Sequence, residues 1–280
     1  EICLTRPLKS VCQGGIHQVS NRLSLTHVTG LSIVGTEHEQ QDTWDEAGEL
    51  AWVLDGATRF TSKESTQVTD WVSRLSSAIK TSYRNTPEAT LNDILADAIL
   101  SAATDGSTFH PSATVAMVRF IEGDADWLVL GDAAVLISSR NGQVTWAQDR
   151  RISRVGMEVR EARREARHAG DERRASTLTI DLLRLEDDHR NKKGGFWVAQ
   201  TNPDAAYQAI SGMTRQATSA ILMSDGVANE IRLGHLGSFE KASERASQEP
   251  ESVMQELRSL LVNRGAPIDD MTMVVAQWKS

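Results

Sequence analysis

Several apolar segments of this 280-residue sequence begin or end at an aspartate. Apolar runs of four or five residues that stop at a turn are typical of buried strands. Strands of this kind can bring their aspartates to one edge of a sheet, where the carboxylates repel one another unless a cation neutralises them. The sequence therefore predicts a site for a hard cation made of oxygen ligands. The aspartates at these strand ends are Asp55 (followed by Gly56), Asp132, Asp225 (followed by Gly226) and the pair Asp269 and Asp270.

The segment from residue 112 to residue 147 has the strongest β character in the chain. Apolar or alternating runs at 112–121, 126–130, 133–138 and 143–146 are separated by turn dipeptides. One of these dipeptides is Asn141-Gly142, and Asn-Gly between two β runs is a strong signal for a tight hairpin. The pattern therefore favours an antiparallel meander over alternating β-α-β units.

The other expected elements follow from apolar periodicity and from turn residues. Residues 35–49 are expected to form a polar turn. The expected helices are 63–83, 91–103, 204–210, 227–233, 237–246 and 251–261. The expected strands are 23–27 and 31–34, joined by a turn at Thr29-Gly30, then 50–55, 196–199, 220–223 and 271–278.

Residues 150–193 are rich in arginine and glutamate and interrupt this pattern. We expect a helical insertion here, with a break at Gly170 and a second periodic stretch at 178–185. The charges favour a solvated helical face with ion pairs between successive turns. The alternative is a basic flap that attracts an anionic substrate. The chain as a whole, 1–280, is expected to be a single domain with a poorly patterned lead-in at 1–20.

Composition excludes several classes of protein. The net charge of −8 argues against a protein that coats nucleic acid. No run of 18 apolar residues occurs, so we expect no membrane span. Two cysteines, Cys3 and Cys12, exclude a disulfide scaffold, and a cytoplasmic location is the expectation. The seven histidines are not spaced as zinc ligands.

The aspartate motifs occur in an order that resembles a known family. The motifs are QD at Asp42, VLDG at Asp55, SATVAMV at Ser112, LGD at Asp132, MSDG at Asp225 and DDMT at Asp269. Over about residues 37–278 this order resembles the type 2C metal-dependent protein phosphatases, the PPM family, and is most similar to its divergent bacterial branch. The resemblance implies an α+β fold, a four-layer α-β-β-α sandwich of two mainly antiparallel sheets flanked by helices.

The same resemblance implies a role for each aspartate in binding Mn²⁺ or Mg²⁺, with two or three ions in the site. Asp55 matches the carboxylate that bridges two metals, and the Gly56 carbonyl matches a backbone ligand of the second. Asp225 and Asp269 match ligands of the first metal. Asp132, together with Asp225, matches the carboxylates of a third metal site. Asp42 matches a residue that binds the second metal through a water molecule or that supports one of its ligands. Asp270 stands where Asn is commoner in the family, and we favour Asp269 as the ligand.

The implied reaction is hydrolysis of a phosphomonoester, phosphoserine or phosphothreonine in a protein, by a hydroxide that bridges two metals. No side chain then serves as nucleophile. Some positions depart from the family pattern: Ala57 stands in place of a His, Gln41 in place of a Glu, and the usual phosphate-binding Arg is missing. Glu37 and His38 occupy that region, and His38 and Arg59 are candidate phosphate contacts.

These departures leave an alternative open: a catalytically weak relative that binds metal or a phosphorylated protein and acts through that interaction. Two other phosphoryl-transfer classes fit less well. A haloacid-dehalogenase-like enzyme needs a second aspartate where Ala57 stands. A response-regulator receiver requires regular β-α-β alternation, which the hairpins of 112–147 contradict.

Overall fold

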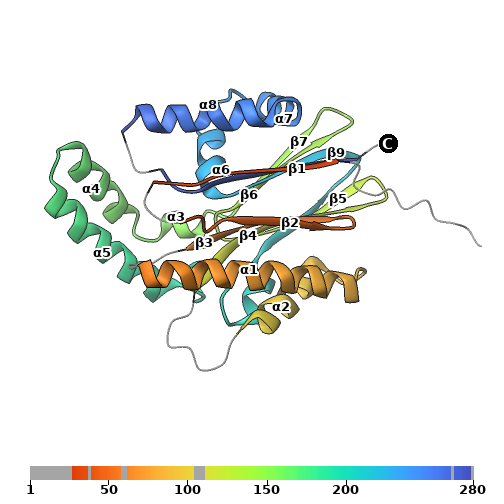
Figure 1. Ribbon diagram of the computed structural model, residues 1–280, viewed down its shortest axis with the longest axis horizontal. Helices are drawn as coiled ribbons and strands as arrows, with labels where there is room; N and C mark the ends of the chain where they lie inside the picture. Colours follow the sequence, from red (N-terminus) through yellow and green to blue (C-terminus); the bar gives the residue numbers. More distant parts are fainter. Residues whose placement is uncertain (1–26, 37–38, 58–61, 104–110, 266–267, 279–280) are drawn as a thin grey trace, which may run out of the picture.

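A computed structural model describes residues 27–36, 39–57, 62–103, 111–265 and 268–278 of the chain. In this part of the chain, two five-stranded sheets lie face to face (Figure 1). The strand orders are β1-β10-β9-β6-β7 and β2-β3-β4-β5-β8, and neighbouring strands in both sheets are antiparallel. We call them the first and the second sheet.

The bounds of the elements are as follows. The strands are β1 His27–Ile33, β2 Thr43–Ala47, β3 Leu50–Ala57, β4 Ser112–Ile121, β5 Asp124–Leu130, β6 Ala134–Ser139, β7 Val144–Gln148, β8 Ile210–Thr214, β9 Ala217–Met223 and β10 Met271–Gln277. The helices are α1 Ser62–Asn85, α2 Leu91–Ala102, α3 Arg151–Arg154, α4 Met157–His168, α5 Glu172–His189, the 3₁₀ helix η1 Pro203–Gln208, α6 Asp225–Arg232, α7 Phe239–Gln248 and α8 Pro250–Asn263.

The central strands are buried on both faces, which explains their continuous apolar sequences. In β3, Trp52 and Leu54 pack with residues of α1 and α2, whereas Ala51 and Val53 pack between the sheets. Helices α6, α7 and α8 cover the outer face of the first sheet, with which they share a third apolar cluster. Figure 1 shows the resulting order of helices, sheet, sheet and helices. The α+β four-layer sandwich expected from the sequence is therefore confirmed.

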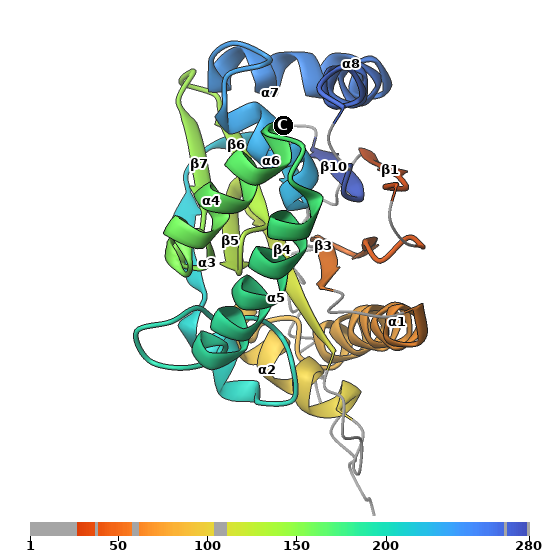
Figure 2. The same ribbon diagram turned by 90° about the vertical axis from the view of Figure 1, so that its left-hand side faces the viewer.

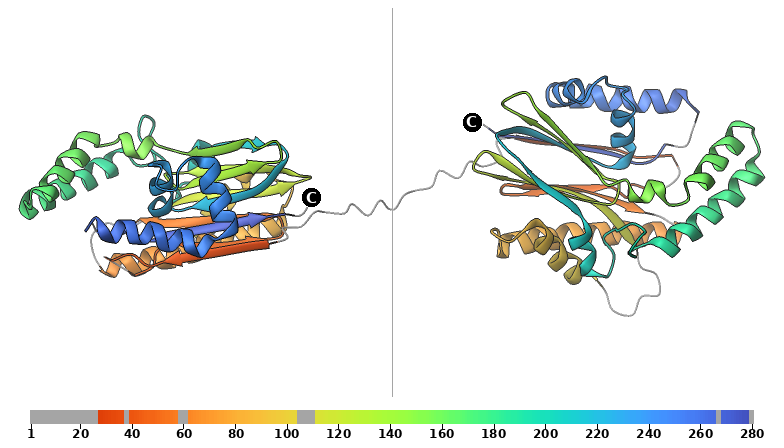
Figure 3. Two further views of the ribbon diagram at one scale, coloured as in Figure 1. Left: turned by 90° about the horizontal axis from the view of Figure 1, so that it is seen from above. Right: turned by 180° about the vertical axis from the view of Figure 1, so that it is seen from behind.

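Helices α4 and α5 form an antiparallel pair, here called the arm, which extends from one end of the sandwich (Figures 2 and 3). Glycines with positive φ stand at both of its joints, Gly156 (φ 65°) before α4 and Gly170 (φ 71°) between the helices. Apart from a few residues such as Leu182, the side chains of the arm are partly or fully exposed. No helix in the described residues has the length and apolar character needed to cross a membrane.

The structure corrects the expected turn at Thr29-Gly30. One continuous strand, β1, covers these residues and pairs with β10. Gly30 is needed there for packing, because a Cβ atom at this position would lie 2.0 Å from Cε2 of Trp44. Most of the expected strand at 23–27, like the lead-in at 1–20, lies outside the described residues.

Two strands were missed and one was wrongly expected. The polar segment before residue 50 contains β2, and β8 follows η1 directly. Both are edge strands with partly exposed side chains, so their apolar signal is weak. Residues 196–199 form only isolated bridges, Arg190 with Phe196 and Ala113 with Ala199. Their apolar character reflects burial of Phe196 and Val198 under the arm end of the sandwich, not strand pairing.

Candidate functional site

Asp42 and Asp55 come from adjacent strands of the second sheet. Thr43 pairs with Leu54 in the β2–β3 hairpin, and the same register continued by one residue sets Asp42 opposite Asp55. Side chains alternate along β3, so Asp55 lies on the same face as Ala51 and Val53, which pack between the sheets. This pair therefore lies at the end of the sandwich where β3 ends, toward the space between the sheets.

Asp132 and Asp225 form the corresponding pair of the first sheet. Ala134 of β6 pairs with Met223 of β9, and the register continued by two residues sets Asp132 opposite Asp225. Asp225 is the first residue of α6, directly after β9. The backbone of Ser224, which precedes it, donates a hydrogen bond to the Thr272 carbonyl (3.0 Å) and so ties this turn to β10.

The two aspartates before β10 have different environments. Asp270 is buried, and its carboxylate accepts hydrogen bonds from the backbone N–H groups of Gly35 (2.7 Å) and Gln41 (2.6 Å). Asp269 is exposed, and its Oδ1 accepts a hydrogen bond from the Asp270 N–H (2.9 Å). Both oxygens of Asp270 are thus engaged by the backbone, whereas Asp269 extends toward the other aspartates, whose pKa values it raises.

We call Asp42, Asp55, Asp132, Asp225 and Asp269 the aspartate cluster. Burial, followed by repulsion from the other carboxylates, raises the pKa of Asp55 and of Asp225 well above the ordinary value. The largest repulsion on Asp55 comes from Asp42, and the largest on Asp225 comes from Asp132, in agreement with the pairing across each sheet.

Asp42 and Asp132 titrate near neutral pH. Burial is the main cause that raises the pKa of Asp42 to about 7, against hydrogen bonds from the Ser224 and Thr272 hydroxyls, which lower it. Burial also raises the pKa of Asp132 to about 6. Without a cation, the cluster therefore retains protons at a pH where isolated aspartates are ionised.

Arg160, near the start of α4, brings a positive charge toward the cluster. Its guanidinium lowers the pKa of Asp132 and of Asp225, which opposes the effect of burial. The side chain is partly exposed and forms an ion pair with Glu186 of α5. The sequence reasoning missed this residue, because nothing in the pattern of the arm shows which of its many arginines faces the aspartates.

Two glycines allow close packing of the chain around the cluster. A Cβ atom on Gly56 would lie 2.9 Å from the Gln41 carbonyl oxygen and 2.5 Å from Cγ1 of Val68. A Cβ atom on Gly226 would lie 2.3 Å from the Asp270 carbonyl oxygen. Because real Cβ atoms do not approach that closely, the Asp-Gly pairs are required by packing as well as by their turns.

The chemistry of the cluster suits a hard divalent cation. Its ligands are carboxylates, with a backbone carbonyl available at Gly56, and Mg²⁺ and Mn²⁺ prefer such oxygens. The buried Oδ2 of Asp42 has no hydrogen-bond partner in the described part of the chain. Even so, no group of three or more His, Cys, Asp or Glu side chains among the described residues is arranged to hold a metal ion. The chemistry of the donor set fits such an ion.

Three other residues singled out from the sequence, Glu37, His38 and Arg59, lie outside the described residues. Ala57 is the last residue of β3 and pairs with Ser112.

The chain matches a known protein family over most of its length. The sequence profile of the family described as "Protein phosphatase 2C" matches residues 29–262. A sequence comparison with curated proteins finds no significant match.

Three solved structures are similar to the chain. The serine/threonine phosphatase Stp1 from Staphylococcus aureus is 12% identical, with a TM-score of 0.56 over 90% of this chain and 95% of Stp1. The S. agalactiae serine/threonine phosphatase is 17% identical, with a TM-score of 0.55 over 90% of this chain and 99% of its own. The Mycobacterium tuberculosis serine/threonine phosphatase PstP/Ppp is 16% identical, with a TM-score of 0.51 over 91% and 99% of the two chains. At these identities the likeness establishes the shared fold.

Proposed function

Because the chain belongs to the protein phosphatase 2C family, we propose that it is a metal-dependent phosphatase that hydrolyses phosphoserine or phosphothreonine in proteins. The observation that carries the proposal is the convergence of five aspartates, from distant parts of the sequence, on one end of the sandwich. The raised pKa values of Asp42, Asp55, Asp132 and Asp225 are the expected result of a carboxylate site that lacks its cation.

We assign the ion-binding role to the cluster and to the Gly56 carbonyl, with two or three Mn²⁺ or Mg²⁺ ions. Such ions, when bound, activate a water molecule as the nucleophile and neutralise charge on the phosphoryl oxygens. The chain itself orients the carboxylates: Asp42 and Asp55 through the β2–β3 hairpin, and Asp225 through the turn between β9 and α6. Asp270 fixes residues 35 and 41, which lead into Asp42.

We assign the role of phosphate contact to Arg160. A guanidinium is suited to a phosphoryl group, because it offers several N–H donors in one plane. Glu186 holds this guanidinium from the other helix of the arm. Arg160 would thus take the place of the arginine that the family pattern leads one to expect before Asp42.

A second candidate function is a binding module without efficient catalysis. The observation that favours it is that, in the part of the chain that the structure describes, no three His, Cys, Asp or Glu side chains are arranged to hold a metal ion. Ala57, which stands where many relatives have a proton-donating His, agrees with this alternative.

The discriminating experiment is turnover of an aryl phosphate and of a phosphothreonine peptide with Mn²⁺, with Mg²⁺ and with chelator. The phosphatase proposal predicts turnover that is lost on chelation and lost in Asp55→Asn, while circular dichroism shows a folded protein. Absence of turnover on both substrates at every metal concentration, with metal binding detected by calorimetry, would instead establish the binding module.

A further inference from the structure

A pocket of about 770 Å³ lies at the base of the arm, where the arm joins the sandwich. Its walls come from α3 and the start of α4, from the chain that follows α5, and from the end of η1. The side chains that matter for its chemistry are Arg151, Arg154, His189, Lys193 and Trp197. We call it the basic pocket, because it is lined by three strongly basic side chains and by no acidic one.

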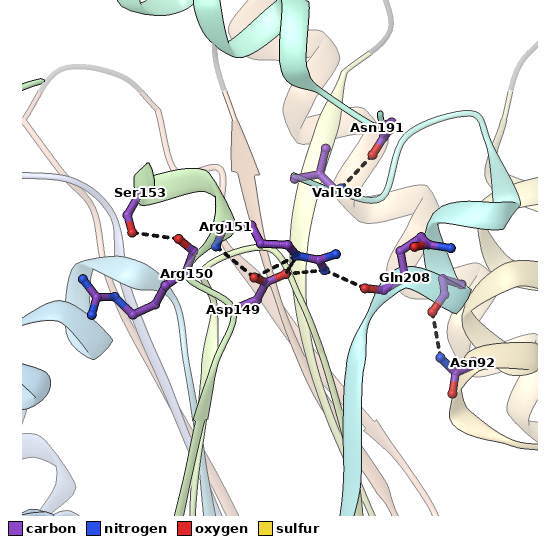
Figure 4. Close-up of polar contacts among 9 residues, drawn as sticks. Asn92, Asp149, Arg150, Arg151, Ser153, Asn191, Val198 and Gln208 are labelled. Carbon is purple, nitrogen blue, oxygen red and sulfur yellow. Dashed lines mark hydrogen bonds and ion pairs between the residues drawn. The ribbon is translucent and has the colours of Figure 1, made fainter. Parts of the chain in front are cut away.

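Arg151 forms the fixed part of the basic pocket. Its Nε and Nη2 atoms donate hydrogen bonds to the buried carboxylate of Asp149 (2.8 Å and 2.5 Å to Oδ2), and Nη2 also donates to the Gln208 carbonyl (2.6 Å). Figure 4 shows this side chain extended between the two partners. Asp149 compensates the charge of Arg151, so this pair gives the pocket a rigid wall rather than a free charge.

Arg154 and Lys193 supply the uncompensated charge. Both side chains line the pocket and are exposed, and neither forms an ion pair with any residue in the described ranges. They come from the two segments that join the arm to the sandwich, Arg154 from the end of α3 and Lys193 from the chain after α5. The ring of His189 is held beside them by a hydrogen bond from Nδ1 to the Leu185 carbonyl (2.8 Å). Two free cations in one concave site attract an anion.

The basic pocket is close to the aspartate cluster along the chain. The side-chain amide of Gln148, the last residue of β7, donates a hydrogen bond to the Asp132 carbonyl (2.9 Å). Arg151 follows three residues later, and three residues of chain span at most about 11 Å. Figure 2 shows α3 and the arm at the same end of the sandwich. A peptide whose phosphorylated residue reaches the cluster can therefore reach this pocket with a residue a few positions away.

We propose that the basic pocket binds a second anionic side chain of the phosphoprotein substrate, a carboxylate or a second phosphate located a few residues from the phosphorylated residue. This inference rests on the proposed phosphatase function. The chain carries a net charge of −8, which disfavours an acidic substrate segment, and the free cations of the basic pocket offset this effect locally. The basic pocket thus determines which phosphorylated sequences are preferred.

The test uses the full chain with Mn²⁺ and three phosphothreonine peptides that differ only in the flanking residues: alanines, glutamates or one phosphoserine. The proposal predicts a higher kcat/KM for the two acidic peptides than for the alanine peptide. In Arg154→Ala/Lys193→Ala this ratio should fall about tenfold, toward one, because both exposed cations that attract the flanking anion are lost. Comparison of the glutamate and phosphoserine peptides shows which anion is bound more tightly.

The matched control is Arg167→Ala/Arg173→Ala, which removes the same charge from exposed positions near the far end of the arm. This control should leave the ratio unchanged. An equal fall in both double variants would overturn the proposal, because it would show an effect of net charge alone. Equal kcat/KM for all peptides in the unmodified chain would overturn it too.

Binding of a fluorescent, non-phosphorylated glutamate peptide, followed by anisotropy, separates this inference from the proposed function. If no peptide is hydrolysed but the labelled peptide binds and the pocket variant loses that binding, the pocket assignment holds and the phosphatase function fails. If all peptides are hydrolysed equally and the labelled peptide does not bind, the pocket assignment fails alone.

Discussion

The aspartate cluster and the basic pocket lie at the same end of the molecule but are built in different ways. The cluster takes its carboxylates from five separate places in the chain, at the ends of strands in both sheets. The pocket takes its cations from two short segments, one on each side of the arm. The sandwich thus supplies the acidic site, whereas the segment between β7 and η1 adds basic groups beside it.

The two regions also differ in how their charges are compensated. In the cluster, repulsion and burial raise the pKa values, and the stabilising partner is a cation from outside the chain. In the arm, ion pairs such as Glu161 with Arg164 are exposed and therefore contribute little to stability. Substitutions in the cluster should therefore have large effects on activity or stability. Substitutions in the arm should have small ones, except at Arg160 and in the basic pocket.

The largest expected effect is on catalysis by the cluster. Asp225→Asn removes one carboxylate of the pair across β6 and β9, and we expect turnover of an aryl phosphate at saturating Mn²⁺ to fall at least about a hundredfold. The matched control is Asp181→Asn on α5, whose side chain is partly exposed and pairs with Arg184. Full activity of Asp225→Asn would show that Asp225 is not part of the catalytic site.

A smaller effect is expected at the point where the arm meets the cluster. Arg160→Gln should raise KM for a phosphothreonine peptide about tenfold or more, because a hydrogen bond to a charged group contributes about 1.5–3 kcal/mol. Arg164→Gln, which removes a more exposed arginine one turn further along α4, serves as the control. An unchanged KM in Arg160→Gln would show that the guanidinium faces the carboxylates without contacting substrate.

The pH dependence of stability tests the raised pKa of Asp42, whose main cause is burial. Asp42 binds its proton with a pKa of about 7 in the folded chain, above the ordinary 3.8, so the folded state holds more protons than the unfolded state between these values. With chelator present, the free energy of unfolding should fall as the pH rises from about 4 to 7. In Asp42→Asn this fall should shrink by at least about 1 kcal/mol, since one pKa unit corresponds to about 1.4 kcal/mol.

Urea unfolding at several pH values measures this effect. Added Mn²⁺ should flatten the same curve for the unmodified chain, because a bound cation favours the ionised carboxylates. A stability curve of identical slope in the two proteins would contradict the assignment of a raised pKa to Asp42.

The smallest effect is expected for the exposed pairs of the arm. Glu161→Gln breaks an ion pair with an N–O distance of 3.3 Å between two largely exposed side chains. We expect a change of less than about 0.5 kcal/mol in the free energy of unfolding. A loss above about 1 kcal/mol would show that the arm depends on its surface charges and would weaken the contrast with the cluster.

Much of the fold could be predicted from local patterns. The helices α1 and α2 and the hairpin β4–β5 follow directly from apolar spacing and from the Glu122-Gly123 turn, whose residues both have positive φ. The edge strands β2 and β8 could not be predicted in this way. Their side chains are partly exposed, and what makes them strands is pairing with β3 and β5.

The candidate site was predicted in part. Asp55, Asp132, Asp225 and Asp269 follow from their positions beside apolar runs, and Asp42 follows from the family resemblance alone. The neighbours of these aspartates in the folded chain do not follow from the sequence. That Asp270 binds the backbone of residues 35 and 41 depends on contacts between segments more than 200 residues apart. Arg160 and the basic pocket depend on how the arm packs against the sandwich, which its solvated, charge-rich sequence does not specify.

The sequence by itself determined which strands are buried and which aspartates stand at their ends, because apolar periodicity and turn residues act over a few positions. The tertiary structure alone decided that Asp42 faces Asp55, that Asp132 faces Asp225, and that Arg154 and Lys193 share one pocket. The physical reason is that strand register and helix packing are set by burial between segments far apart in the chain, and no local pattern records those contacts.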